Sequence, residues 1–481
     1  MSDTAGLAEQ IQAKVSELAE EHGVVGVAVG ILYDGQEHYA YHGVTSIENP
    51  LPVDEKTYFQ FGSTGKTYTA TAMMRLVDQG KVDLDATVCT YLPDFKLKDE
   101  DVAAKVTVRH LFNHTAGWEG DMMDDTGPGD DALQKYVERM VRLEQVTPLG
   151  ESVSYNNASL SVAGLIIERI MGTTYEQAMK DLLFEPLGLT ETLIFPNDIM
   201  TRRFVVGHNR ENEDTVKIAR PWWLPRGNCP AGGISSNARD QLAWAKFHLG
   251  DGTAADGTRI LSKELLDLMK QPTAEMKGSA LGDYVGISWL MRDVDGVRLV
   301  GHGGTTNGQH SEFVTVPERG FALISMTNTG PSGPQLNHDL EKWALETILG
   351  LSVPEPEPIA LGDEALAVYA GTYETIAATC EISAENGRLA AKVNIKPDFA
   401  AILRESGEEV PEEQPPVPLA LLSSEGDQYV VPEGPGKGMR GYFTRDSEGN
   451  VVGVHLGGRL ATRVVSVPEQ TDAGDGALTP A

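Results

Sequence analysis

A serine and a lysine lie three residues apart in the segment FGSTGKTYTA, from Phe61 to Ala70. On a helix, Ser63 and Lys66 share one face, so the amine can take the hydroxyl proton and make the serine a nucleophile. If the helix begins at Ser63, its own N–H belongs to the unpaired first turn and can donate to an oxyanion. The alternative is an ordinary capping serine beside an exposed lysine.

The same segment also ends like a phosphate-binding loop. That loop requires the spacing G-x-x-x-x-G-K-[ST], which would place its first glycine at position 60. The residue there is Gln60, and the upstream TYFQF contains no glycine. The spacing therefore disfavours nucleotide binding and leaves the nucleophilic serine as the hypothesis to test.

A second group of reactive residue types follows a Pro-Gly loop, in PLGESVSYNNASLSVAGLIIERIMG. Tyr155 precedes an apolar helical pattern, and a phenolate beside an ammonium is a plausible general base. The amide of Asn157 can bond both a lysine and a substrate carbonyl. The alternative is a structural tyrosine before a helix that an asparagine caps.

A third group ends the predicted strand VRLVGH and comprises His302, Gly303, Gly304 and Thr305. Two glycines at a strand end allow a substrate backbone to approach closely, and the Thr305 N–H is a candidate second oxyanion donor. In lipases an HGG loop precedes the nucleophile, and the nucleophile lies in G-x-S-x-G. Neither condition holds here, so the lipase arrangement is excluded.

These three groups are far apart in the chain and need a fold that gathers them. Apolar runs on either side of Asp34-Gly35 predict two strands joined by a turn, and a helix is expected from near Ser63 to Gly80. Residues 100–200 have a mostly helical pattern, and strands return over 284–328. The order predicts an α+β fold in which distant segments pair into one antiparallel sheet.

The pattern changes at the proline-rich segment VPEPEPIALG, which predicts a linker over 353–362. Before it, 1–352 is expected to form the catalytic domain. After it, short alternating runs predict an all-β domain over 363–468, a small barrel or sandwich. The tail 469–481 has the composition of a disordered segment.

Composition limits the partners and the location. The chain of 481 residues has 39 Lys and Arg against 70 Asp and Glu, a net charge of −31, which repels nucleic acid and anionic membranes. It has no apolar stretch of membrane-spanning length and no signal-peptide core near its start, so we expect a cytoplasmic protein.

The sequence gives no sign of a metal ion or another cofactor. The three cysteines are widely separated and match no disulfide or zinc spacing. His110 and His114 are four residues apart, but Leu111 stands where a zinc protease motif has its glutamate, and no third ligand is evident. We therefore expect neither a metal site nor a cofactor.

The motifs STGK, YNN and HGG together resemble those of the penicillin-recognising serine hydrolases, which carry S-x-x-K, Y-x-N and K-T-G or H-x-G in this order. This superfamily includes class C β-lactamases, D-alanyl-D-alanine carboxypeptidases, D-stereospecific aminopeptidases and esterases. Segments such as VTVRHLFNHTAGW and PAGGISSNARDQLAWAKF are similar too, and the resemblance covers roughly 8–350. It implies a class C β-lactamase-like domain: an antiparallel sheet flanked by helices, plus an all-helical region.

The resemblance also implies roles for the matching residues. Ser63 would be acylated, while Lys66 and Tyr155 would share the proton transfers. Asn157 would orient Lys66 and the substrate. The oxyanion would be bound by the backbone N–H groups of Ser63 and Thr305, and the substrate would lie along Gly303, Gly304 and Thr305.

His302 departs from the lysine of true class C β-lactamases. A histidine is largely neutral at pH 7 and makes a weaker demand for a substrate carboxylate than a lysine does. It is similar to the H-x-G of the aminopeptidase branch, which implies cleavage of a small amide, short peptide or ester, in a D-stereospecific aminopeptidase or amidase. A β-lactamase or D-alanyl-D-alanine carboxypeptidase, and a non-catalytic penicillin-binding protein, stay open as alternatives.

The segment that begins with VYAGTYE resembles the small β-barrel domains appended to such aminopeptidases. In that family the barrel can reach over the active-site cleft. The loop 433–441 and the acidic, proline-rich loop 408–416 are the candidates for such a contact. The alternative is a module that only stabilises or dimerises the protein, and a homo-oligomer is compatible with the sequence.

Overall fold

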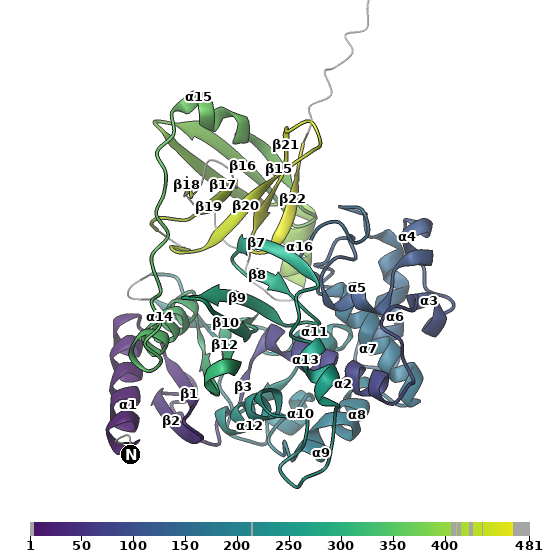
Figure 1. Ribbon diagram of the computed structural model, residues 1–481, viewed down its shortest axis with the longest axis vertical. Coiled ribbons are helices and arrows are strands. Elements are labelled where there is room, and N and C mark those ends of the chain that lie inside the picture. Colours follow the sequence, from purple (N-terminus) through teal and green to yellow (C-terminus); the bar gives the residue numbers. More distant parts are fainter. Residues whose placement is uncertain are drawn as a thin grey trace, which may run out of the picture.

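The computed structural model describes residues 4–212, 215–405, 410, 415–422, 427–434 and 436–464. The predicted disordered tail, 469–481, and most of the acidic loop 408–416 lie outside the described residues. The described chain forms a large unit of helices and sheet, above which a smaller β-barrel stands next to β7 (Ala274–Ser279) and β8 (Gly282–Val285) (Figure 1).

The large unit is built on one antiparallel sheet. The predicted hairpin is β1 (Gly26–Tyr33) and β2 (Gln36–Gly43), whose turn residues Asp34 and Gly35 both have positive φ, as the right-handed twist of a hairpin favours. β1 pairs along its other edge with β13 (Phe321–Thr327), nearly 300 residues later in the chain. The expected pairing of distant segments is therefore confirmed.

The order of strands in this sheet is β2-β1-β13-β12-β10-β9-β8-β7, and β11 pairs with β12 beside that path. The strands not yet given are β9 (Leu290–Val294), β10 (Val297–Gly301), β11 (Gly304–Thr306) and β12 (Gln309–Val316). β10 pairs with β12 only at its last two residues, after which β11 takes its place. The break between β10 and β11 falls at His302 and Gly303, so the HGG segment lies at an opening in the sheet.

Helices cover both faces of the sheet. On one face, α1 (Thr4–Glu21) and α14 (Ser332–Thr347) bury an apolar cluster with alternate residues of β1, β12 and β13. On the other face, α12 (Ala238–Leu249) packs so closely that a Cβ on Gly30 of β1 would lie 2.9 Å from the Leu242 side chain. This three-layer arrangement leaves the strand ends near β11 free to border a site.

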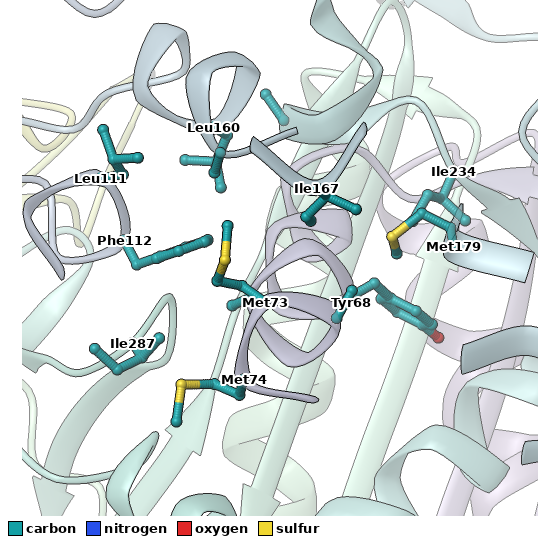
Figure 2. Packing of buried hydrophobic residues seen from close by; sticks show 14 of the residues in the cluster. Tyr68, Met73, Met74, Leu111, Phe112, Leu160, Ile167, Met179, Ile234 and Ile287 are labelled. Carbon is teal, nitrogen blue, oxygen red and sulfur yellow. The ribbon is translucent and has the colours of Figure 1, made fainter. Parts of the chain in front are cut away.

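The second face continues into an all-helical region around α2 (Gly65–Asp78). Tyr68, Met73 and Met74 of this helix contact a large cluster that includes Leu160 and Ile167 of α7 (Ala158–Met171) (Figure 2). Eleven of the 14 residues of α2 are buried, because the helix runs through the middle of the region. Such a helix is held rigidly at the end that carries Ser63.

Smaller elements complete this unit. The helices are α3 (Val88–Tyr91), α4 (Glu100–Lys105), α5 (Val108–Phe112), α6 (Ala132–Arg139), α8 (Tyr175–Met179), α9 (Glu185–Leu187), α10 (Pro196–Ile199), α11 (Cys229–Gly232) and α13 (Lys263–Leu268), with one π-helical turn at Lys180–Phe184. The short strands are β3 (Phe59–Gln60), β4 (His208–Arg210), β5 (Val216–Ile218), β6 (Ser235–Ser236) and β14 (Thr329–Gly330). They confirm the predicted mixture of strands at both ends of the unit and helices between.

The C-terminal unit is a closed antiparallel barrel, one of the two all-β forms expected. Its strands are β15 (Gly371–Glu374), β16 (Ala378–Glu385), β17 (Arg388–Ile395), β18 (Val417–Leu421), β19 (Gln428–Val430), β20 (Arg440–Arg445), β21 (Val451–Leu456) and β22 (Arg459–Arg463). Two helices accompany them, α15 (Asp363–Leu366) and α16 (Pro397–Glu405). Side chains such as Tyr373, Phe443 and Val454 fill the interior and give the barrel a core of its own.

The proline-rich segment 353–362 has neither helix nor strand. Because each side of it has a separate hydrophobic cluster, it suits the linker predicted from the sequence, although the boundaries of the domains stay a prediction. Of the helices in the described chain, none has the length and the apolar character needed to cross a membrane.

Candidate active site

Ser63 lies in a single 3₁₀ turn, Gly62–Thr64, that leads directly into α2. One turn further on, the Lys66 ammonium nitrogen donates hydrogen bonds to Ser63 Oγ at 2.9 Å and to the Ala231 carbonyl at 2.7 Å. Lys66 is fully buried. Burial lowers its pKa well below the usual value, and the charge of Arg459 lowers it further. The amine is therefore biased toward its neutral form, which can accept the Ser63 proton.

Tyr155 lies against this pair. The Lys66 nitrogen is 4.8 Å from the centre of the Tyr155 ring, and Tyr155 borders the cleft together with Ser63. Burial raises the pKa of Tyr155, and the nearby Ser63 side chain offsets this only in part. Burial thus favours a neutral phenol beside a neutral amine, rather than the phenolate and ammonium that we considered from the sequence.

Asn157 lies in the same site but has a different partner from the one expected. Its amide donates to Asp121 Oδ1 at 2.8 Å, whereas the hydrogen bonds found for the Lys66 nitrogen go to Ser63 and Ala231. Burial alone would raise the pKa of Asp121, but the charge of Arg459 and the bonds from Arg459 and Asn157 outweigh it, and the pKa is lowered. Asn157 therefore orients a buried carboxylate.

Arg459 is a residue of the site that the sequence reasoning missed. It stands on β22 of the barrel, donates to both carboxylate oxygens of Asp121 at 2.5 and 3.1 Å, and lies 5.0 Å from the Tyr155 ring centre. The Gly-Gly-Arg run at 457–459 is typical of a tight turn, but nothing in it indicates a partner more than 300 residues earlier. A pair of this kind is visible only in the folded chain.

The hairpin between β21 and β22 holds Arg459 in place through its backbone. The Tyr155 N–H donates to the Gly458 carbonyl at 2.9 Å, and the Leu460 N–H donates to Ser154 Oγ at 3.2 Å. The barrel thus contacts the chain at the candidate base itself. The loop 433–441, which we had considered for this contact, contributes none of its described residues to the cleft.

His302 is buried beside Tyr155, with 6.1 Å between the ring centres. Its Nδ1 lies 2.6 Å from the Gly303 carbonyl, which can only accept, so Nδ1 carries the proton. Burial and the charge of Lys66 lower the pKa of His302 to about 3. The ring is therefore neutral at pH 7, with Nε2 as its unprotonated nitrogen.

The HGG segment and the serine turn are in backbone contact. A Cβ on Gly304 would lie 1.9 Å from the Phe61 carbonyl oxygen and 2.8 Å from the Ser63 nitrogen. A Cβ on Gly62, whose φ is +55°, would lie 2.6 Å from the Thr305 nitrogen. Only glycine fits at both positions. The two backbone segments are therefore adjacent, and they carry the two candidate oxyanion donors, the N–H groups of Ser63 and Thr305.

A cleft of about 810 Å³ joins these groups. It is bordered by the predicted residues Ser63, Tyr155, Asn157, His302, Gly303, Gly304 and Thr305. Its opposite wall comes from the barrel and α16, and is mostly apolar: Ala378, Val393, Phe399, Leu403 and Leu456. The cleft therefore lies between the two units, and a bound molecule would touch both.

The two histidines with metal-like spacing have other partners. His110 Nδ1 bonds the backbone and side chain of Thr107 and caps α5, while His114 is buried with its ring 4.5 Å from that of Tyr155. Among the residues that the structure describes, no group of three or more His, Cys, Asp or Glu side chains is arranged to hold a metal ion. His114 instead helps to enclose Tyr155.

Comparison with known proteins adds to this geometry. Penicillin-binding protein 4 of Amycolatopsis lactamdurans is 35% identical over 373 residues, which are 76% of this chain and 96% of that protein. The structure of SurE is similar over 96% of this chain and 100% of its own, with a TM-score of 0.75 at 24% identity.

The structure of D-amino acid amidase from Ochrobactrum anthropi SV3, complexed with L-phenylalanine, is similar over 72% of this chain and 99% of its own, with a TM-score of 0.59 at 25% identity. The sequence profile of the beta-lactamase family matches residues 11–347, the part that carries all three motifs. The chain belongs to the beta-lactamase family, within the penicillin-recognising serine hydrolases.

Proposed function

We propose that the protein cleaves a small amide, peptide or ester through an acyl-enzyme on Ser63. The observation that carries the proposal is the contact of a buried, neutral-biased Lys66 amine with Ser63 Oγ at 2.9 Å, with the Tyr155 ring centre 4.8 Å from the same amine. A serine hydroxyl needs a neighbouring base to attack a carbonyl, and a lysine with a lowered pKa is such a base near neutral pH.

In the proposed reaction Lys66 takes the proton as Ser63 Oγ bonds to the substrate carbonyl carbon. The negative charge that develops on the carbonyl oxygen is stabilised by the N–H groups of Ser63 and Thr305. Tyr155 passes a proton to the leaving amine or alcohol and recovers one from Lys66. Water then attacks the acyl-enzyme, with its proton going to the same pair of groups, and releases the acid and free Ser63.

For the substrate, we propose an amide or ester of a D-amino acid, without a free C-terminal carboxylate. The neutral ring of His302 supports this, since it offers no fixed charge to a substrate carboxylate. Arg459 also brings a positive charge to the cleft, but this charge is paired with the carboxylate of Asp121. The similarity to a D-amino acid amidase at 25% identity supports the same class.

The test combines a covalent label with turnover. A fluorophosphonate probe should label the protein on Ser63 and leave Ser63→Ala unlabelled. The wild type should then hydrolyse a D-phenylalanine amide faster than the L-form and faster than nitrocefin. A wild type that resists the probe and turns over none of these substrates would contradict the proposal.

Two other functions have support from the relatives. A β-lactamase or D-alanyl-D-alanine carboxypeptidase is supported by the family, and fast nitrocefin turnover or release of D-alanine would place it first. A non-catalytic penicillin-binding protein is supported by the similarity to penicillin-binding protein 4 of Amycolatopsis lactamdurans. Stable labelling of Ser63 by penicillin without turnover of any amide or ester would favour that function.

A further inference from the structure

A second group of charged side chains borders the same cleft, beyond Gly303. Glu312 of β12 and Arg292 of β9 both line it, and Glu341 of α14 lies behind them, paired with Arg292. A Glu312 carboxylate oxygen is 3.3 Å from the place where a Cβ on Gly303 would stand. This carboxyl group therefore lies against the strand along which we expect the substrate to bind.

The charges in this group do not balance. It holds two carboxyl groups and one guanidinium, and the ion pair of Arg292 goes to Glu341. Burial, followed by the charge of Glu341, raises the pKa of Glu312 to about 8, while the charge of Arg292 and a backbone hydrogen bond at Phe313 offset this only in part. Asp283 of β8 adds a further negative charge near Arg292. A cation that entered here would stabilise the ionised form of Glu312.

Glu312 has no evident need to be a carboxylic acid for the sake of the fold. Arg292 and Glu341 already satisfy one another, and a second, partly buried carboxyl beside such a pair costs free energy unless something compensates for it. Titratable groups with raised pKa values in a cleft are found mostly where a ligand or a reaction uses them. The missing compensation is a positive charge.

We propose that Glu312 binds a primary ammonium group of the substrate. This rests on the proposed function, because the substrate must lie along Gly303–Thr305 with its carbonyl at Ser63. Side-chain directions alternate along a strand, so Gly304 faces Ser63 while Gly303 faces Glu312. The ammonium and the carbonyl therefore lie on different sides of this strand.

The distance selects the kind of ammonium group. Gly303 and Thr305 are two residues apart, which is about 7 Å along a strand. The α-amino nitrogen of the acylated residue is only two bonds from its carbonyl carbon and is too close. A lysine-like side chain on that residue, or the amino terminus of a longer peptide, has the required reach, and both present the same primary ammonium.

The first test compares charged and neutral substrates of one shape. We would measure kcat/KM for the methyl esters of Nα-acetyl-lysine and Nα-acetyl-norleucine, each in D and L form. The wild type should prefer the lysine ester by roughly ten- to a hundredfold, the range of a charge-assisted hydrogen bond. Glu312→Gln should bring the ratio close to one, while Glu318→Gln, in the exposed turn that follows the same strand, should keep it.

The preference should also depend on pH in a defined direction. Only ionised Glu312 attracts the ammonium, so the lysine-to-norleucine ratio of the wild type should rise between pH 6.5 and 9. A ratio of one at every pH, both in this pair and in the peptide pair that follows, overturns the proposal, and this measurement needs no variant to fold. The two sources of the ammonium, a lysine-like side chain and a peptide amino terminus, are separated with a second pair of substrates. The methyl esters of glycyl-D-alanine and acetylglycyl-D-alanine differ in the free amino terminus. A preference for the free amino terminus in this pair alone assigns Glu312 to that group.

A binding measurement separates this inference from the proposed function. Calorimetric titration of Ser63→Ala with Nα-acetyl-D-lysine amide, in two buffers of different ionisation enthalpy, should show binding with proton release. The Ser63→Ala, Glu312→Gln protein should bind at least tenfold more weakly, without proton release. Binding without hydrolysis by the wild type would contradict the hydrolase and keep the subsite. Hydrolysis without a preference for the ammonium, and without binding linked to proton release, would contradict the Glu312 subsite and keep the hydrolase.

Discussion

The two walls of the cleft hold their polar groups in opposite ways. On the catalytic wall, Lys66 and Tyr155 are buried in a rigid helical region, and burial drives both toward their neutral forms. On the barrel wall, the surface is mostly apolar and Arg459 keeps its charge, because Asp121 accepts two hydrogen bonds from it. We propose that proton transfer belongs to the first wall, while the second supplies a fixed field and a hydrophobic surface.

The largest expected effect is the loss of the nucleophile. Ser63→Ala should abolish covalent labelling and lower kcat by several orders of magnitude, on the order of 10⁵ to 10⁶, as in other hydrolases that lose their serine. The measurement is labelling by a fluorophosphonate followed by peptide mapping, together with steady-state kinetics. Ser154→Ala is a control on a serine that contacts the barrel instead. Covalent labelling of a different serine would show that Ser63 is not the nucleophile and that the chemistry does not take place at the catalytic wall.

The next largest effect concerns Lys66 and Tyr155 as one proton-transfer unit. Each of Lys66→Ala and Tyr155→Phe should lower kcat by about 10² to 10⁴, the usual range for general acid–base catalysis. Because the two groups touch the same serine, the double variant should be little worse than the poorer single variant. Losses that multiply in full would show that the two residues act independently.

Arg459 tests whether the barrel wall acts on the chemistry. Arg459→Ala removes a positive charge that lowers the pKa of Lys66, so that pKa should rise. A base with a higher pKa is protonated up to a higher pH, and the acidic limb of kcat/KM should therefore move to higher pH. We expect a roughly ten- to a hundredfold loss at pH 7, measured as a full pH profile.

Arg388→Ala is the matched control for this prediction. Arg388 lies on the barrel surface and pairs with Glu433, both largely exposed. Its removal should leave the pH profile unchanged. If Arg459→Ala lowers activity but does not move the acidic limb, the arginine only holds the barrel in place and the proposed field is wrong.

The smallest expected effect is a change of substrate preference at His302. With a neutral ring there, matched amides should be better substrates than the corresponding acids in the wild type. His302→Lys should shift the ratio toward the acid by about tenfold, the lower end of the range for a charge-assisted hydrogen bond, because burial at this position lowers the pKa of a lysine and reduces its charge. The measurement is kcat/KM for a matched pair. A wild type that already prefers the acid strongly would favour the carboxypeptidase alternative.

Short-range patterns predicted much of this protein. The spacing of Ser63 and Lys66 at a helix start indicated their hydrogen bond, and the hairpin at Asp34-Gly35 and the barrel strands followed from alternating runs. The order of the three motifs led to the family. These features depend on residues close together in the chain, or on a pattern shared with relatives, and both can be read without coordinates.

The sequence did not predict which residues from distant parts of the chain contact one another. We assigned the Asn157 amide to Lys66, but it donates to Asp121, because Arg459 arrives from the barrel and holds that carboxylate in the site. We also looked for the barrel contact in the loop 433–441, while the hairpin at 457–459 makes it. No periodicity or spacing encodes which loop of one domain meets which residue of another.

The sequence by itself determined which residue types do the chemistry, because helix geometry sets Lys66 one turn from Ser63 wherever the helix lies. It also determined Gly304 of the HGG segment, whose backbone passes where no Cβ fits. Only the tertiary structure decided the protonation states and the opposite wall. Burial sets the pKa values of Lys66 and Tyr155, and burial is a property of the packed chain, as is the position of Arg459 on a domain that folds around a core of its own.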